Sequence, residues 1–172
     1  KTAYEIPLVT GVQTCALPIW AGTNVDIDAA DMSKEKLSAI SDAIQAGNNV
    51  GTISNLRVTD AQSADELGYL LGKASDAHVV ATGMGYEKLN VLAANRGKIA
   101  DGGITGAIVV DSGVTNIANL LAKVSSANTT TVTVNAADMS VAQLKDLAAA
   151  TKACTLSGLS LAWFTGENAS NL

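Results

Sequence analysis

The chain has 172 residues, with 11 Lys and Arg against 16 Asp and Glu, and a formal net charge of −5 at pH 7. Nucleic-acid binding depends largely on clustered Lys and Arg, which this acidic chain lacks, so we expect no nucleic-acid partner. No stretch approaches the roughly 20 apolar residues that cross a bilayer, so we expect no membrane span.

The first nineteen residues, "KTAYEIPLVTGVQTCALPI", differ in composition from the rest and resemble a translated sequencing adapter. We therefore set residues 1–19 apart as a non-native segment and assign residues 20–172 to one domain. Cys15 lies in the segment set apart, which leaves Cys154 alone. A single cysteine supports no disulfide framework and no metal cluster, and we interpret it as a packing residue.

Five amphipathic helices are predicted along the domain. Each begins at an apolar anchor followed by apolar residues at i+3, i+4 or i+7 spacings, which form one stripe of a helix. The anchors are Leu37, Leu67, Leu89, Ile117 and Leu144. Four residues before each anchor stands a residue type that favours the N-cap position: Ser33, Ser63, Gly85, Gly113 and Ser140. Two of these caps are followed three residues later by the Glu or Gln of a capping box, namely Ser63 with Glu66 and Ser140 with Gln143.

A short strand is predicted before each cap, and a sixth near the end of the chain. Alternating apolar residues rich in β-branched types are typical of strands. The predicted strands are Val25–Ile27, Leu56–Val58, Val79–Ala81, Ile108–Val110, Val132–Val134 and Leu159–Leu161. Loops are predicted after helices at 47–49, 101–103 and 125–128, where Gly, Asn, Asp and Ser gather.

The strand and helix recur as a βα unit. The five caps are spaced by 30, 22, 28 and 27 residues, and "AADMS" occurs both at 29–33 and at 136–140. Alternating strands and helices indicate an α/β fold with a parallel sheet. The short period favours a βα repeat solenoid resembling leucine-rich repeats, with five units and a truncated sixth. The alternative is a fragment of a β/α barrel or of a doubly wound domain.

The best enzymatic candidate is the glycine pair Gly102 and Gly103 in "DGGITG", which resembles the phosphate-binding turns of β/α barrels. A glycine pair between a helix and a strand is also ordinary connection chemistry, and we favour that interpretation.

The other polar residues do not form a metal or catalytic motif that recurs in the predicted units. Asp26, Asp28 and Asp31 could suggest calcium, but the matching positions near the second "AADMS" include Thr133 and Asn135, so we interpret them as a solvated turn. His78 is the sole histidine and is interpreted as a loop or strand-edge residue. We therefore expect no catalytic residues, no metal and no cofactor.

One surface follows from the predicted stacking, the row of middle strand residues. The candidate binding residues on this row are Asp26, Arg57, Thr133 and Ser160, with the apolar Val80 and Val109 between them. Such a row lines the open face of a repeat protein, where a partner can bind. Simple packing under another layer is the alternative.

The stretches "TVTVNAADMSVAQLKDLAAAT" and "NVDIDAADMSKEKLSAISDAI" resemble units of very large, repetitive bacterial surface or secreted proteins, which are adhesin-like and often exported by type I secretion. The resemblance implies a non-enzymatic structural or adhesive segment at the cell surface or outside the cell, and a chain that is a fragment of a larger protein. The expected partners are the neighbouring repeats of the same chain and a host or cell-surface protein or glycan. A leucine-rich-repeat-like module that binds a protein or glycan is the alternative function, followed by a β/α-barrel enzyme fragment.

Overall fold

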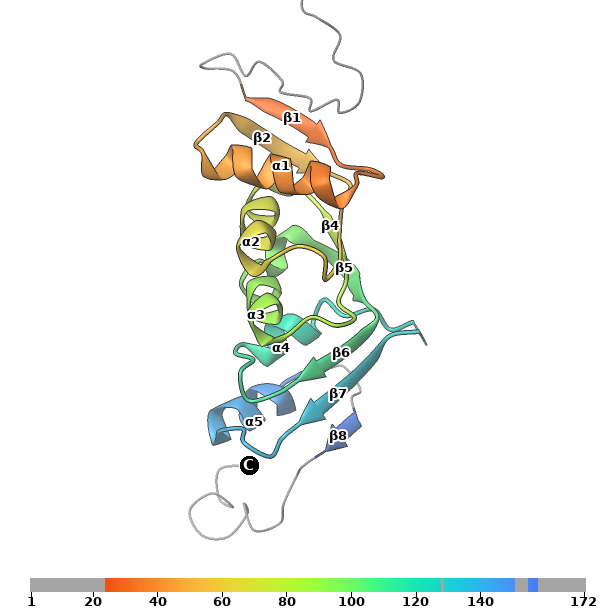
Figure 1. The fold of residues 1–172 in the computed structure, drawn as a ribbon. Coiled ribbons are helices and arrows are strands. Elements are labelled where there is room, and N and C mark those ends of the chain that lie inside the picture. Colours follow the sequence, from red (N-terminus) through yellow and green to blue (C-terminus); the bar gives the residue numbers. More distant parts are fainter. Residues whose placement is uncertain (1–23, 128, 151–154, 158–172) are drawn as a thin grey trace, which may run out of the picture.

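In the computed structural model, which describes residues 24–127, 129–150 and 155–157, parallel strands alternate with helices (Figure 1). The elements succeed one another in chain order along an elongated molecule, with helices along one side and strands along the other (Figure 1). They are β1 (Val25–Asp28), α1 (Lys34–Gln45), β2 (Val50–Ser54), β3 (Leu56–Val58), α2 (Ala64–Lys73), β4 (Ala77–Val80), α3 (Tyr86–Ala94), the 3₁₀ turn η1 (Arg96–Lys98), β5 (Ile99–Thr105), β6 (Ala107–Val110), α4 (Ile117–Leu121), β7 (Thr131–Asn135), α5 (Val141–Ala148) and β8 (Thr155–Ser157). The predicted α/β class with parallel strands is confirmed.

The described strands form three small parallel sheets, ordered β1-β2, β3-β4-β5 and β6-β7-β8. A single residue separates β2 from β3 and β5 from β6, and both residues have positive φ: Asn55 at 54° and Gly106 at 92°. Gly and Asn are the residues that adopt this left-handed conformation most readily, so each marks the point where the chain leaves one sheet for the next. Among the described strands, β1 and β8 each pair on one edge only, so these strands close no barrel.

Five predicted strands overlap observed ones, namely β1, β3, β4, β6 and β7. The sixth, Leu159–Leu161, lies outside the described residues. The predicted loop at 101–103 is wrong, because these residues belong to β5. The register explains the error: Ala77 pairs with Ile99, but Val79 pairs with Ile104, so β5 holds extra residues in a bulge.

The helices begin where four of the five predicted caps stand, at Ser33, Ser63, Gly85 and Ser140. The fifth prediction is wrong, since α4 begins after Asn116. Gly113 belongs instead to the turn after β6, where its N–H donates to the Asp111 carboxylate at 2.9 Å.

The two predicted capping boxes are present, which gives a matched test of their contribution. The Ser63 hydroxyl accepts from the Glu66 N–H at 3.2 Å, and the Ser140 hydroxyl accepts from the Gln143 N–H at 3.3 Å. Replacing either serine by alanine should lower the free energy of unfolding by about 0.5–2 kcal/mol. Ser33→Ala is the control, because the Ser33 hydroxyl accepts no hydrogen bond from a backbone N–H of α1. Urea denaturation of the three variants should rank Ser33→Ala as the mildest, and an equal loss in all three would contradict the assignment.

Glu66 also connects α2 to α1, and this contact predicts a dependence on pH. Hydrogen bonds from the Ser38 hydroxyl, and then from the Ser63 N–H, hold the pKa of Glu66 below its ordinary value. A lowered folded pKa means that the stabilisation is complete above the unfolded pKa of about 4.3 and is lost as the pH falls through the folded value. The free energy of unfolding should therefore fall below about pH 4.3. Comparing Glu66→Gln with the parent chain should show a shallower fall in the variant, and identical pH profiles would count against this contact.

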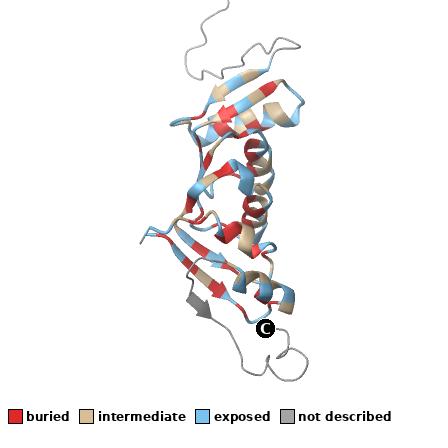
Figure 2. Ribbon diagram, turned by 180° about the vertical axis from the view of Figure 1, so that it is seen from behind, coloured by how far each residue is buried: buried red, intermediate tan, exposed pale blue. Residues whose placement is uncertain are grey.

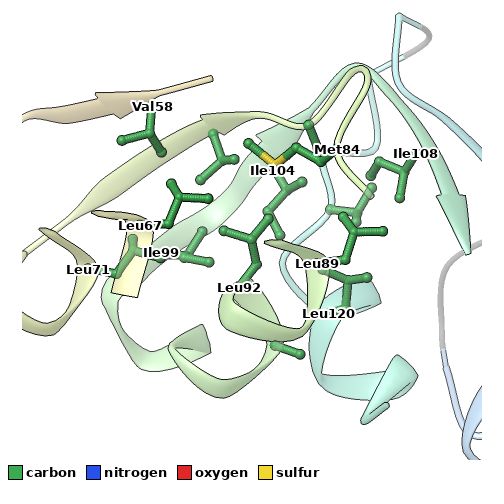
Figure 3. Packing of buried hydrophobic residues seen from close by; sticks show 14 of the residues in the cluster. Val58, Leu67, Leu71, Met84, Leu89, Leu92, Ile99, Ile104, Ile108 and Leu120 are labelled. Atoms are coloured by element: carbon green, nitrogen blue, oxygen red, sulfur yellow. The ribbon is translucent and has the colours of Figure 1, made fainter. Parts of the chain in front are cut away.

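The core is an apolar layer between strands and helices (Figure 2). The five predicted anchors are all buried, and the central part of the layer brings Leu89 and Leu92 beneath Ile104 and Ile108 (Figure 3). Each helix packs against the next one in the chain, from α1 on α2 to α4 on α5. The helical stripes read from the sequence therefore become one continuous core.

Candidate functional site

The predicted binding row lies on the strand side, away from the helices. Asp26, Arg57, Val80 and Val109 are exposed and Thr133 is half-buried, as expected for side chains that alternate with buried neighbours. Ser160 lies outside the described residues. The Val80 and Val109 side chains remain 46% and 55% exposed, so no described layer covers them.

The strand register does not join these residues into one row. Val109 does face Thr133 on the neighbouring strand, as predicted. Arg57, however, faces His78, and Val80 lies beside Thr105. The row is interrupted because the three sheets are separated at Asn55 and Gly106 and because β5 carries a bulge.

His78 joins Arg57 in a small polar patch that the sequence interpretation missed. His78 was predicted as a loop or strand-edge residue and lies within β4, and both side chains are exposed. Within the described part of the chain, neither side chain has a recorded hydrogen bond or ion pair. Arg carries a fork of donors suited to a carboxylate. The sequence did contain a signal for this placement, because His78 stands between the apolar Ala77 and Val79, as an exposed strand residue does.

The acidic residues of the first turn are already engaged. The Asp26 carboxylate accepts from the Thr52 N–H at 2.7 Å, and Asp28 accepts from the Ala30 N–H and the Asn55 amide, both at 3.0 Å. The Asn55 bond is the main cause that lowers the pKa of Asp28. Across the described residues, no group of three His, Cys, Asp or Glu side chains could hold a metal ion.

The glycine pair serves the backbone of β5. Gly102 has a φ of +67°, and Gly103 is buried. A Cβ at Gly103 would lie 2.8 Å from the Ala100 carbonyl oxygen and 2.9 Å from that of Ala77. Carbonyl oxygens repel a phosphate, so this packing gives Gly103 a structural role.

A polar depression of about 360 Å³ lies where β6 and β7 end and α3 begins. Its lining residues are Tyr86, Asp111, Ser112, Gly113, Asn135 and Asp138. The Tyr86 ring lies over Gly113, since a Cβ there would meet Cγ, Cδ1 and Cδ2 of the ring at 2.6–2.9 Å. The sequence interpretation missed this constellation, because its members come from three separate turns that only the fold brings together.

No family model matches the chain, and no curated protein or solved structure matches it significantly. In the described part of the chain, no helix combines the length and apolar character required to span a bilayer.

Proposed function

We propose that the chain is a non-enzymatic structural and adhesive segment of a large bacterial extracellular or cell-surface protein, built as a βα repeat solenoid. Its mechanism is stacking: each unit adds strand residues to a small parallel sheet and one helix to a continuous layer. Stability in such a stack comes from the units and from the interfaces between neighbours. The neighbouring units are therefore the first partners of each unit.

The observation that carries this proposal is the sequence distance between contacting residues. Side-chain hydrogen bonds between distant positions join residues 21–31 apart, as in Thr105 to Val79, Arg96 to Asn119 and Ala118 to Asp146. These separations bracket the period of the predicted unit. Helices likewise pack on their neighbours in the chain. A stack of units accounts for this pattern, because each unit touches the one before it and the one after it.

Equivalent positions also make equivalent contacts. The residue before the anchor reaches back to the preceding turn in two units: the Lys88 ammonium donates to the Asp60 carbonyl at 2.6 Å, and the Gln143 amide donates to the Ser112 carbonyl at 2.8 Å. The turns themselves share one backbone bond, from residue i+3 to residue i. It joins Met32 to Ala29, Met84 to Ala81, Val114 to Asp111 and Met139 to Ala136, at 3.1–3.3 Å.

Surface location can be tested on the bacterium that makes the protein. Antibodies raised against the chain should label intact cells, or the medium, without permeabilisation, while antibodies against a cytoplasmic protein should not. Labelling that requires permeabilised cells would sink the proposal.

A leucine-rich-repeat-like module that binds a protein or glycan is the second candidate, and the exposed strand side favours it. Arg57 offers a positive charge there, His78 offers an imidazole ring, and Val80 and Val109 offer apolar surface. If this face binds, replacing Arg57 and Thr133 together by alanine should abolish capture of the partner and leave the circular dichroism spectrum unchanged. Lys73→Ala, an exposed residue of α2, is the matched control. Unchanged capture by the double variant would exclude the face.

A further inference from the structure

We propose that the depression around Tyr86 is a binding site for a neutral glycan. This inference deepens the adhesive role proposed above and rests on it, because it gives adhesion a place on the molecule and a ligand class. The site is distinct from the strand face that carries Arg57. It occupies the ends of β6 and β7, where turns supply side chains above a rigid frame.

Tyr86 presents an exposed aromatic ring that is held in place. Tyr86 is 47% exposed although it stands at the first residue of α3, and one side of its ring covers Gly113. A side chain at Gly113 would collide with the ring, so glycine permits this close approach. The uncovered part of the ring is a flat, electron-rich surface facing solvent. The C–H face of a pyranose is apolar with a slight positive charge, and it packs well on such a ring.

Hydrogen-bond donors and acceptors are mixed around the Tyr86 ring. One oxygen of Asp111 accepts from the Gly113 N–H, which leaves its other oxygen as an acceptor. Asn135 Oδ1 accepts from the Ala137 N–H at 3.3 Å, which leaves the Asn135 amide N–H₂ as a donor. Asp138 adds a carboxylate and Ser112 adds a hydroxyl. Sugar hydroxyls both donate and accept, so they can use this mixture fully.

The same mixture disfavours other ligand classes. An anion would meet the carboxylates of Asp111 and Asp138, and these two alone do not form a metal cluster among the described residues. The depression is about 360 Å³, at the small end of the range for ligand sites, which suits one or two sugar residues. A neutral glycan can pack on the Tyr86 ring, form hydrogen bonds with the polar groups around it without adding a negative charge, and fit the volume of the depression.

The test uses the full chain with isotope-labelled tyrosine, titrated with lactose, maltose, cellobiose and N,N′-diacetylchitobiose, each to 50 mM. At least one of these disaccharides should shift the Tyr86 ring signals saturably in nuclear magnetic resonance spectra. Tyr86→Ala should weaken binding at least tenfold, and Tyr86→Phe, which keeps the ring, should retain it. Tyr69→Ala is the matched control, since Tyr69 is a similarly exposed tyrosine on α2.

Asp138→Asn should weaken binding as well, because it replaces a carboxylate acceptor by an amide. Absence of a saturable shift of the Tyr86 ring signals with all four sugars would overturn the proposal. Equal weakening of binding by Tyr69→Ala would also overturn it, as would Tyr86 signals that shift with calcium and with none of the sugars. Surface labelling of intact cells is independent of these results. A labelled surface without sugar binding would therefore reject the glycan site and leave the structural role intact.

Discussion

Replacement of Leu89 by alanine is expected to lower the free energy of unfolding by about 2–5 kcal/mol. Leu89 anchors α3, is 0% exposed and lies in the middle of the apolar layer (Figure 3). Helices pack on both sides of α3, so several neighbours fix the walls of the resulting cavity. Walls that relax little give the larger losses in this range, because the cavity remains empty.

Urea denaturation followed by circular dichroism measures this loss. Val109→Ala is the control, since Val109 is apolar but 55% exposed, and its free energy of unfolding should change by less than about 0.5 kcal/mol. If Leu89→Ala and Val109→Ala behaved alike, the helix layer would not form the core described for this chain.

Replacement of Gly103 by alanine is expected to destabilise the chain by about 1–3 kcal/mol through overpacking. The added methyl group would meet the carbonyl oxygens of Ala77 and Ala100 within 3 Å, and backbone atoms cannot swing aside as a flexible side chain can. The bulge in β5 and its pairing with β4 would both have to move.

Gly68→Ala provides the opposite expectation with the same chemical change. Gly68 lies inside α2, and nothing stands within 4 Å of the added methyl group. Alanine should therefore stabilise that helix by roughly 0.5–1 kcal/mol. Thermal unfolding of the two variants should move the midpoint in opposite directions. Gly103→Ala with an unchanged midpoint would remove the structural explanation for this glycine and return it to the candidates for ligand binding.

The helices could be predicted well from the sequence, because the residues that signal a helix lie close together in the chain. The stripe that begins at Leu67 and the capping box of Ser63 and Glu66 lie within a few residues of each other, so no distant contact is required to recognise them. The same holds for Ser140, Gln143 and Leu144. The buried anchors and both capping boxes follow from these local patterns.

The strands were harder to predict, because pairing can override local signals. Asp101, Gly102 and Gly103 are typical of a loop, yet the neighbouring β4 pairs with residues on either side of them, and a bulge absorbs the excess. Gly113 stands at the sequence position predicted for a helix cap, but in the structure its lack of a side chain leaves room for the Tyr86 ring.

The candidate sites could not be predicted from the sequence for a similar reason. Arg57 and Val80 occupy matching positions in the predicted units, but register places His78 opposite Arg57. The Tyr86 depression combines residues up to about fifty positions apart, including Asp138. No local pattern joins them, because their proximity depends on which turns lie next to one another in the fold.

A stack in which each unit contacts its neighbours should come apart in steps when the single chain is pulled from its two ends with optical tweezers. A folded unit lengthens the stack by about 4.8 Å, the spacing between neighbouring strands, whereas 27 residues extend to about 90 Å when unfolded. Release of one unit should therefore lengthen the chain by about 85 Å. We expect several steps of this size or of twice this size, with Leu89→Ala weakening the central steps. A single rupture that releases the whole folded length at once would contradict it.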